Sequence, residues 1–435
     1  MKAKVKLIIT AFSLIPSIAT AEGLPLKELL NVALKNNPQI QITEKDYKIA
    51  RYEQKEAIGK FLPKIELQYS RIFQSDVPEI NLSLPAPGLP PQQFPLIEKN
   101  YYSFKATLTQ PLFTGGYLYY NYKIKSKEEK AVKFQMKAKV NEIKKIIKKD
   151  YYSLSEAKTA VDIAKSYVKA ARKHLQDAEA FYKEGIVPRR DLLEAKVKYH
   201  EALEFLSKAR SGYEVALEKL KTDIGVKTVK IDVKKLTYKP LKLDTEKLIE
   251  TAYQNNPLIK FLKLKKEEAN YGVRIAYSQF LPKVAAVIGY ERTDQYPGID
   301  KFDETFGALT INVPIFEGTQ RYWRTLKAKE TKQKVDLSLK EAKDKIKLGI
   351  VAAVSKIKSA ESRIKTAEAM VEEAKELLKD SEERYKAQVG TSTEVCDAMA
   401  YFTKAKGMLN SAIADYNKAL AELEYYTGTE IIQKQ

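Results

Sequence analysis

The fold is decided by residues 154–182, which read LSEAKTAVDIAKSYVKAARKHLQDAEAFY. Apolar residues recur there at alternating spacings of three and four, and the same pattern resumes in residues 192–220. A seven-residue repeat is typical of helices that supercoil around a partner. Between the two segments, Gly185 and Pro188 interrupt the pattern. The stretch therefore predicts a long helical hairpin with its tip near residues 185–191.

The same hairpin occurs a second time, 203 residues further along the chain. Tyr182 and Leu220 correspond to Tyr385 and Leu423, and the apolar positions between them match. An Asn-Asn-Pro motif precedes each copy, at 36–38 and 255–257, and proline there favours a break between two helices. Such a duplication predicts one body built from two similar halves.

Between the opening helix and the long hairpin of each half, the apolar period changes from 3.6 to 2. This alternation predicts four strands of about ten residues, a length that crosses a bilayer when tilted. From alternation alone, a water-soluble sheet with one face on a core fits equally well. Aromatic residues near the strand ends are typical of membrane interfaces. The strands lie near residues 65–73, 102–108, 284–290 and 305–313.

The first 21 residues indicate export from the cytoplasm. They combine Lys2, Lys4 and Lys6 with a short apolar stretch and an Ala-Thr-Ala cleavage site, which favours a cleaved secretory signal over a membrane anchor. No later stretch approaches 18 apolar residues in a row, so the mature chain is expected to meet a membrane only through strands. Four strands cannot close a barrel alone, because an open edge in lipid leaves backbone groups unpaired. The barrel must therefore be shared between subunits.

Composition argues against two other classes of function. The net charge of +20 invites a nucleic-acid interpretation, but the lysines are interleaved with glutamates along helix faces rather than clustered. We expect no nucleic-acid partner. The sequence contains no nucleophile–base pair, phosphate loop or metal motif, and His174 and His200 are isolated. We therefore do not expect the protein to be an enzyme or to bind a cofactor or a metal. Cys396 is the only cysteine, so a disulfide within one chain is excluded. We expect Cys396 to serve as a small side chain in the packing of the helices.

The chain resembles the TolC-type outer-membrane efflux protein family, also called the outer membrane factors. The resemblance rests on both Asn-Asn-Pro motifs, on Gln110–Gly116 and its copy at 313–318, and on both hairpin tips. It implies a mainly α fold with membrane β-strands: duplicated long α-helical hairpins form a coiled-coil tunnel, and four transmembrane strands per chain share a 12-stranded β-barrel in a homotrimer. The resemblance also implies a location in the outer membrane, in contact with its lipid, with the tunnel extending into the periplasm.

The family implies a function as the exit duct of a tripartite efflux or type I secretion system. Such a duct is a passive conduit, gated at its periplasmic end, and its partners are a periplasmic adaptor (membrane fusion) protein and an inner-membrane pump. A soluble periplasmic coiled-coil scaffold or adaptor is the alternative, against which the paired strands and aromatic residues argue. Drugs, metal ions and polypeptides all remain open as substrates.

The sequence also predicts the domain organisation. We expect a signal peptide (1–21), a first structural repeat (22–225), a linker (226–243), a second structural repeat (244–428) and a C-terminal tail (429–435). Each repeat comprises a helix, a β-hairpin (62–113 or 281–316) and a long helical hairpin (117–224 or 320–425).

Four acidic residues beside the tips are the candidate site. Asp191 and Glu194 follow the first tip, Glu394 and Asp397 follow the second, and residues three apart share a helix face. By resemblance, Glu394 and Asp397 ring a narrow periplasmic aperture, where carboxylates attract cations. Acids in a first helical turn also complement the helix dipole, and for Asp191 and Glu194 we favour that simpler role.

The tips themselves are the expected adaptor contacts. They contain Gly185 in the first hairpin and Gly390, Thr391 and Ser392 in the second. Family members commonly carry a basic residue where this chain has Ser392, and that residue helps to tie the closed aperture. Arg189 and Arg190 are the candidates to supply the tie from the first tip.

Overall fold

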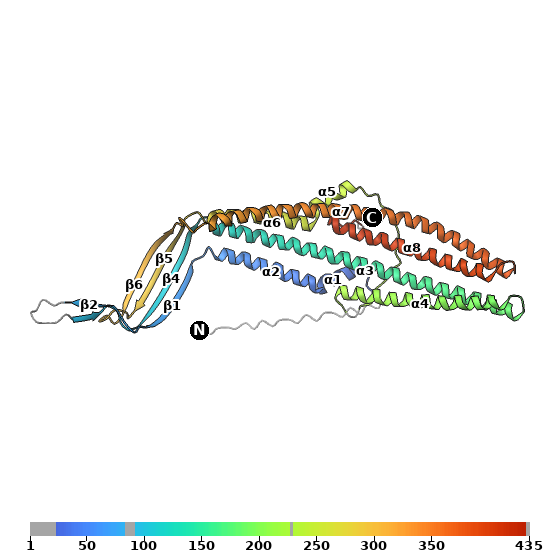
Figure 1. Ribbon diagram of the computed structural model, residues 1–435, viewed down its shortest axis with the longest axis horizontal. Helices are drawn as coiled ribbons and strands as arrows, with labels where there is room; N and C mark the ends of the chain where they lie inside the picture. The colour runs from blue at the N-terminus through green and yellow to red at the C-terminus, as the bar shows by residue number, and fades with distance from the viewer. Residues whose placement is uncertain (1–22, 83–91, 227–228, 432–435) are drawn as a thin grey trace, which may run out of the picture. The chain divides into compact units, whose positions relative to one another are not determined.

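The computed structural model describes residues 23–82, 92–226 and 229–431 (Figure 1). The predicted signal peptide, residues 83–91 within the first predicted β-hairpin, residues 227–228 of the predicted linker and residues 432–435 of the predicted tail lie outside these ranges. The described chain divides into two compact units. Among the described residues, the hairpin unit comprises 23–38, 143–226, 229–242 and 353–422, and the sheet unit comprises 39–82, 92–142, 243–352 and 423–431.

Helices follow the same order in both halves of the chain. The long arms α3 (Tyr117–Lys183) and α7 (Gln320–Lys386) have 67 residues each, and the return arms α4 (Arg189–Ile224) and α8 (Ser392–Thr427) have 36 each. Figure 1 shows α4 alongside α3 and α8 alongside α7. The duplicated long hairpins expected from the sequence are confirmed. The shorter helices are α1 (Leu26–Asn36), α2 (Pro38–Gly59), α5 (Thr245–Asn255) and α6 (Pro257–Ser278).

Alanine is the residue that brings the helices of the hairpin unit together. Most alanines of the seven-residue repeat are buried, whereas its larger residues divide between buried and half-buried positions. Small side chains let two helix backbones approach closely, so the alanine stripe forms the centre of each seam. On the first hairpin this stripe consists of Ala164, Ala171, Ala178, Ala195 and Ala202.

The Asn-Asn-Pro motifs fasten the opening helices to the ends of the return arms. Asn37 donates from Nδ2 to the carbonyl of Asp223 over 2.9 Å, and Asn256 donates to the carbonyl of Tyr426 over 2.8 Å. Each return arm then ends in a left-handed glycine, with φ of 83° at Gly225. A Cβ atom on Gly225 would lie 3.1 Å from the carbonyl oxygen of Asn36, so a glycine is needed there for both conformation and space.

The sheet unit contains one four-stranded antiparallel sheet in the order β1-β4-β5-β6, which confirms the four predicted strands. The central pair joins the two halves of the chain, with Leu108 of β4 opposite Ile288 of β5. Strands β1 and β6 are the edges, and their apolar side chains are exposed: Leu67 by 67% and Leu309 by 62%. The strands span Lys64–Phe73, Asn100–Thr114, Lys283–Thr293 and Phe302–Asn312.

Two further strands were not expected from the sequence. Strands β2 (Glu79–Leu82) and β3 (Gln92–Pro95) pair with each other as a separate two-stranded sheet. The surrounding prolines favour turns and irregular structure, which hid this short pairing. Among the described residues, no helix is both long enough and apolar enough to cross a membrane.

The segment between the two halves lies in the hairpin unit as an extended strap, residues 231–239. It is held by side chains of α3 and α8: Tyr151 donates from Oη to the carbonyl of Asp232 over 3.0 Å, Ser155 donates from Oγ to Lys234 over 2.6 Å, and Tyr416 donates from Oη to Lys239 over 2.5 Å. The strap therefore fastens the first hairpin to the second.

Candidate functional site

Backbone geometry at the two tips differs. The first tip turns through Gly185, whose φ of 73° is left-handed and suits glycine. At the second tip Gln388 has a φ of 62°, a conformation that no other non-glycine residue in the described ranges adopts. Gly390 follows, and a Cβ atom there would lie 3.0 Å from Cβ of Arg384 and 3.1 Å from Oε2 of Glu394. The second tip is thus the more tightly constrained of the two.

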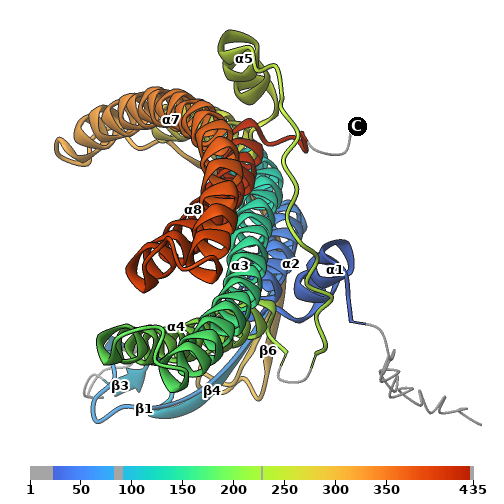
Figure 2. The same cartoon turned by 90° about the vertical axis from the view of Figure 1, so that its right-hand side faces the viewer.

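A buried polar contact joins the second tip to the first hairpin. Ser392, the first residue of α8, is 1% exposed, and its Oγ atom lies 2.9 Å from Nε2 of His174 on α3. The next residue, Thr393, donates from Oγ1 to Oε2 of Glu194 on α4 over 2.9 Å. Figure 2 looks onto the tips and shows α8 facing α3. The start of α8 is therefore bonded to both arms of the first hairpin.

Sequence reasoning missed His174, although a signal was present. The residue lies three positions after Ala171 and four before Ala178, on the buried alanine stripe. A polar side chain on an otherwise small and apolar stripe needs a partner when buried. Ser392 is that partner.

An apolar cluster supports this contact. Tyr385, Val395, Cys396 and Met399 are buried together, with side chains of α3 and α7 packed around them. The rings of Tyr385 and His174 lie 4.9 Å apart between centroids. The hydroxyl of Tyr385 is buried and forms no hydrogen bond to any described residue. Tyr385 thus fills space at this site rather than linking polar groups.

Burial keeps the titratable groups of the cluster uncharged. It lowers the pKa of His174 below its ordinary value, although the nearby carboxylates of Asp177 and Asp191 oppose the shift. Burial, followed by the charges of Asp191 and Asp177, raises the pKa of Tyr385 to about 12. Burial, followed by the charge of Glu194, likewise raises the pKa of the Cys396 thiol to about 12. The tip contact is therefore a neutral one at pH 7.

The predicted acidic residues separate into two environments. Asp191 and Glu194 are half-buried against the second tip, whereas Glu394 and Asp397 are exposed on α8. Asp191 lies in the first turn of α4 and Glu394 in the first turn of α8, where negative charge complements the helix dipole. The structure brings Glu194 into contact with Thr393 and leaves Glu394 and Asp397 facing solvent.

The basic residues of the first tip are also exposed. Within the described part of the chain, neither Arg189 nor Arg190 forms an ion pair. A role of these arginines in holding the aperture closed therefore stays a prediction about the assembled protein. Thr391 is exposed, and its Oγ1 atom accepts a hydrogen bond from the backbone N–H of Glu394 over 3.2 Å. No cluster of three metal-ligating side chains occurs among the described residues.

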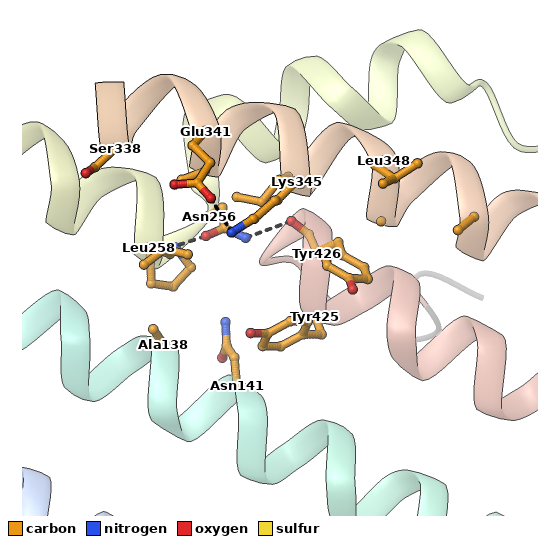
Figure 3. Close-up of a pocket in the computed structure, with 15 residues that line it drawn as sticks. Ala138, Asn141, Asn256, Leu258, Ser338, Glu341, Lys345, Leu348, Tyr425 and Tyr426 are labelled. Atoms are coloured by element: carbon orange, nitrogen blue, oxygen red, sulfur yellow. Dashed lines mark hydrogen bonds and ion pairs between the residues drawn. The ribbon is translucent and has the colours of Figure 1, made fainter. Parts of the chain in front are cut away.

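A cavity of about 590 Å³ lies in the sheet unit, next to the second Asn-Asn-Pro motif (Figure 3). Several of its polar groups are already paired with one another. Asn256 bonds to the carbonyl of Tyr426 and accepts from the N–H of Leu258, and Lys345 forms an ion pair with Glu341. We therefore interpret this cavity as part of the packing around the Asn-Asn-Pro motif. The hairpin tips remain the candidate functional site.

Comparison with known proteins agrees with this architecture. The model of the outer membrane efflux protein family matches residues 29–226 and 248–429, which is most of the chain. No curated protein matches the chain in a sequence search. Several solved structures are similar in fold at low sequence identity.

Three of these structures are outer-membrane proteins of bacteria. VceC from Vibrio cholerae has a TM-score of 0.76 at 16% identity, covering 93% of this chain and 96% of its own. The CmeC channel of Campylobacter jejuni has a TM-score of 0.75 at 18% identity, with 94% and 87% covered. The open state of the MtrE channel of Neisseria gonorrhoeae has a TM-score of 0.74 at 16% identity, with 93% and 89% covered. The family match twice along the chain, together with the duplicated hairpins and the four-stranded sheet, leads to one conclusion: the chain belongs to the outer membrane efflux protein family.

Proposed function

We propose that three copies of this protein form the outer-membrane exit duct of an export system. The observation that carries the proposal is the pair of open sheet edges in a member of this family. Strands β1 and β6 each present an unpaired backbone edge and exposed apolar side chains. Each unpaired backbone group costs several kcal/mol, on the order of 2–7, away from water. Pairing β6 of one copy with β1 of the next removes both edges.

The number of strands supports a trimer. Three copies of the four-stranded sheet supply a closed barrel of twelve strands, an even number as in other barrels of the bacterial outer membrane. Strands of 10 and 11 residues at the edges have the length that crosses a bilayer when tilted. The apolar faces of β1 and β6 then contact lipid.

The long hairpins supply the wall of the duct. Their exposed faces carry interleaved lysine and glutamate, as expected of helices in contact with water. The duct itself performs no energy-consuming step in this proposal; an inner-membrane pump drives export, and a periplasmic adaptor bridges the two. Residues 1–21 direct the chain out of the cytoplasm, and residues 22–225 and 244–428 act as two equivalent repeats of the duct.

The tips form the periplasmic gate in this proposal. Glu394 and Asp397 are exposed and lie one helical turn apart, so three copies would bring six carboxylates to the aperture. Gly185, Gly390 and Thr391 form the outermost surface that an adaptor contacts. Ser392 belongs to the packing of the gate rather than to that surface, because it is buried against His174.

The alternative, a soluble periplasmic scaffold, fits less well. In such a protein Leu67 and Leu309 would face water, together with the other apolar side chains of the edge strands. Contiguous apolar surfaces of this kind mark contacts with a membrane or a partner.

Cysteine cross-linking across the two edges tests the trimer. We would replace Cys396 by Ala, place a cysteine at Gln68 near the middle of β1, and scan second cysteines through residues 305–309 of β6. Oxidation in outer-membrane fractions is expected to give covalent trimers for the positions in register. The matched control places the first cysteine at Lys105 of β4, which already has neighbours on both sides and should give none. A soluble monomer in the periplasmic fraction would contradict the proposal.

A further inference from the structure

A second cavity, of about 550 Å³, lies in the hairpin unit beside the strap. Its walls come from α3, α7, α8 and the strap itself, so four separate segments of the chain define it. The strap is fixed there by the hydrogen bonds of Tyr151, Ser155 and Tyr416 to its backbone carbonyls. The cavity is thus a built feature of the fold, and its size is in the range of small-molecule sites.

Positive charge converges on this cavity. Lys158, Lys235 and Lys406 all line it, one each from α3, the strap and α8. Lys158 donates from Nζ to the carbonyl of Val233 over 2.8 Å. Within the described part of the chain, Lys235 and Lys406 form no ion pair with any carboxylate, and Nζ of Lys406 lies 4.0 Å from the centroid of the Phe402 ring. Two cations therefore line the cavity without a direct ion pair, Lys235 exposed to solvent and Lys406 half-buried.

The surroundings of Lys406 disfavour its charged form. Burial, followed by the positive charges of Lys235 and Lys375, lowers the pKa of Lys406 below its ordinary value. One carboxylate, Asp162, also lines the cavity, but it is exposed and lies 3.8 Å from Lys165. An anion between Lys235 and Lys406 would relieve their repulsion.

The cavity also has an apolar lining. Branched aliphatic side chains from all four segments contribute to it, namely Ile163, Val233, Leu236, Val371, Leu409 and Ile413. A cavity lined by both lysine and aliphatic side chains suits a ligand that joins a charged group to a hydrocarbon part.

We propose that this cavity binds an anionic amphiphile, a molecule that joins one carboxylate or phosphate group to a hydrocarbon part. Lys235 and Lys406 hold the anionic group, and the aliphatic wall covers the hydrocarbon. Because the strap and both hairpins contribute, a bound ligand also strengthens the junction between the two halves of the chain.

Titration calorimetry on the full-length protein in neutral detergent tests the proposal. The probes are octanoate and octyl phosphate, with octanol as the uncharged control and acetate as the head group alone. Saturable binding of either octyl anion, at least about tenfold tighter than octanol, is expected, because a charge-assisted hydrogen bond supplies that much. The tighter of the two anions identifies the head group as carboxylate or phosphate.

Variants then locate the site. Lys235→Ala with Lys406→Met is expected to weaken binding about tenfold or more, whereas Lys404→Ala, an exposed neighbour on α8, should leave it unchanged. Leu236→Trp keeps every charge but fills the cavity, and should also abolish binding. Thermal melts confirm that each variant is folded. Absence of saturable binding to the native protein, or equal binding by the double variant, would overturn the proposal.

Discussion

The Nε2 atom of His174 lies 2.9 Å from the Oγ atom of Ser392, and both residues are buried. One belongs to the first hairpin and the other to the second, so the two tips meet through a neutral hydrogen bond. The contact gives Ser392 a buried packing role in this chain. A long cationic side chain at position 392 would have to be accommodated beside a buried imidazole.

Replacing Ser392 by arginine should therefore disrupt the packing of the tips. The substitution forces a long charged side chain into a position that is 1% exposed and removes the bond to His174, so we expect a loss of about 2–4 kcal/mol of stability. The midpoint of urea denaturation measures the change. Thr391→Arg is the matched control, because Thr391 is exposed and adjacent. Equal effects of the two substitutions would contradict the buried contact.

The tip contact should weaken in acid. Burial lowers the pKa of His174 in the folded protein, so the unfolded chain takes up a proton at a higher pH than the folded one. The contribution of neutral His174 to the free energy of unfolding is fully present above the ordinary histidine pKa of about 6.5. As the pH drops through that value towards the pKa in the folded protein, the free energy of unfolding falls by at most about 1.4 kcal/mol per pH unit.

Thermal melts between pH 8 and pH 5 check this dependence. His174→Gln should flatten the part of the curve below about pH 6.5, the ordinary histidine pKa. His200→Gln, at an exposed position, should leave the curve unchanged. A native curve that is already flat over this range would rule the effect out.

The thiol of Cys396 should not react with thiol reagents in the folded protein. Its side chain is fully buried, and burial raises the pKa of the thiol to about 12, so almost no thiolate is present at pH 8. Maleimide labelling followed by mass spectrometry should detect modification only after denaturation. As a positive control, Thr391→Cys in a Cys396→Ala background should react within the same time. Rapid labelling of the native protein would contradict the burial.

The exposed acids should control cation block. In planar bilayers, Glu394→Ala combined with Asp397→Ala should weaken block of the conductance by divalent cations at least about tenfold, since carboxylate rings concentrate cations. The control removes two exposed glutamates with the same spacing, Glu373→Ala with Glu376→Ala, away from the tip. If the two double variants show the same block, the aperture is not formed by Glu394 and Asp397.

Much of the fold was predictable because it repeats. The seven-residue pattern and its copy 203 residues later determined the hairpins, and the alternation near β1, β4, β5 and β6 determined the sheet. The pairing of β2 with β3 was missed because its strands have only four residues each among prolines. Short pairings depend on contacts that a local pattern does not contain.

The candidate site was predicted less completely. The exposed position of Glu394 could be inferred from its place at the start of a helix, but the partner of Ser392 could not. His174 lies 218 positions away in the sequence, and only the packing of two hairpins brings the residues together. Alanines on both sides of His174 mark its burial, yet they do not say which residue faces it.

The pairing of β4 with β5 has a consequence for assembly. It places a seam between two equivalent repeats inside one chain, whereas in the proposed trimer the β6-to-β1 seam forms between chains. A chain of one repeat would need six molecules to meet, whereas the duplicated chain needs three. Half of the seams thus form at an effective concentration set by the covalent connection and independent of how much protein has been exported. In the proposed trimer, the internal repeat therefore lowers the number of molecules that must associate, which favours complete rings over unfinished ones.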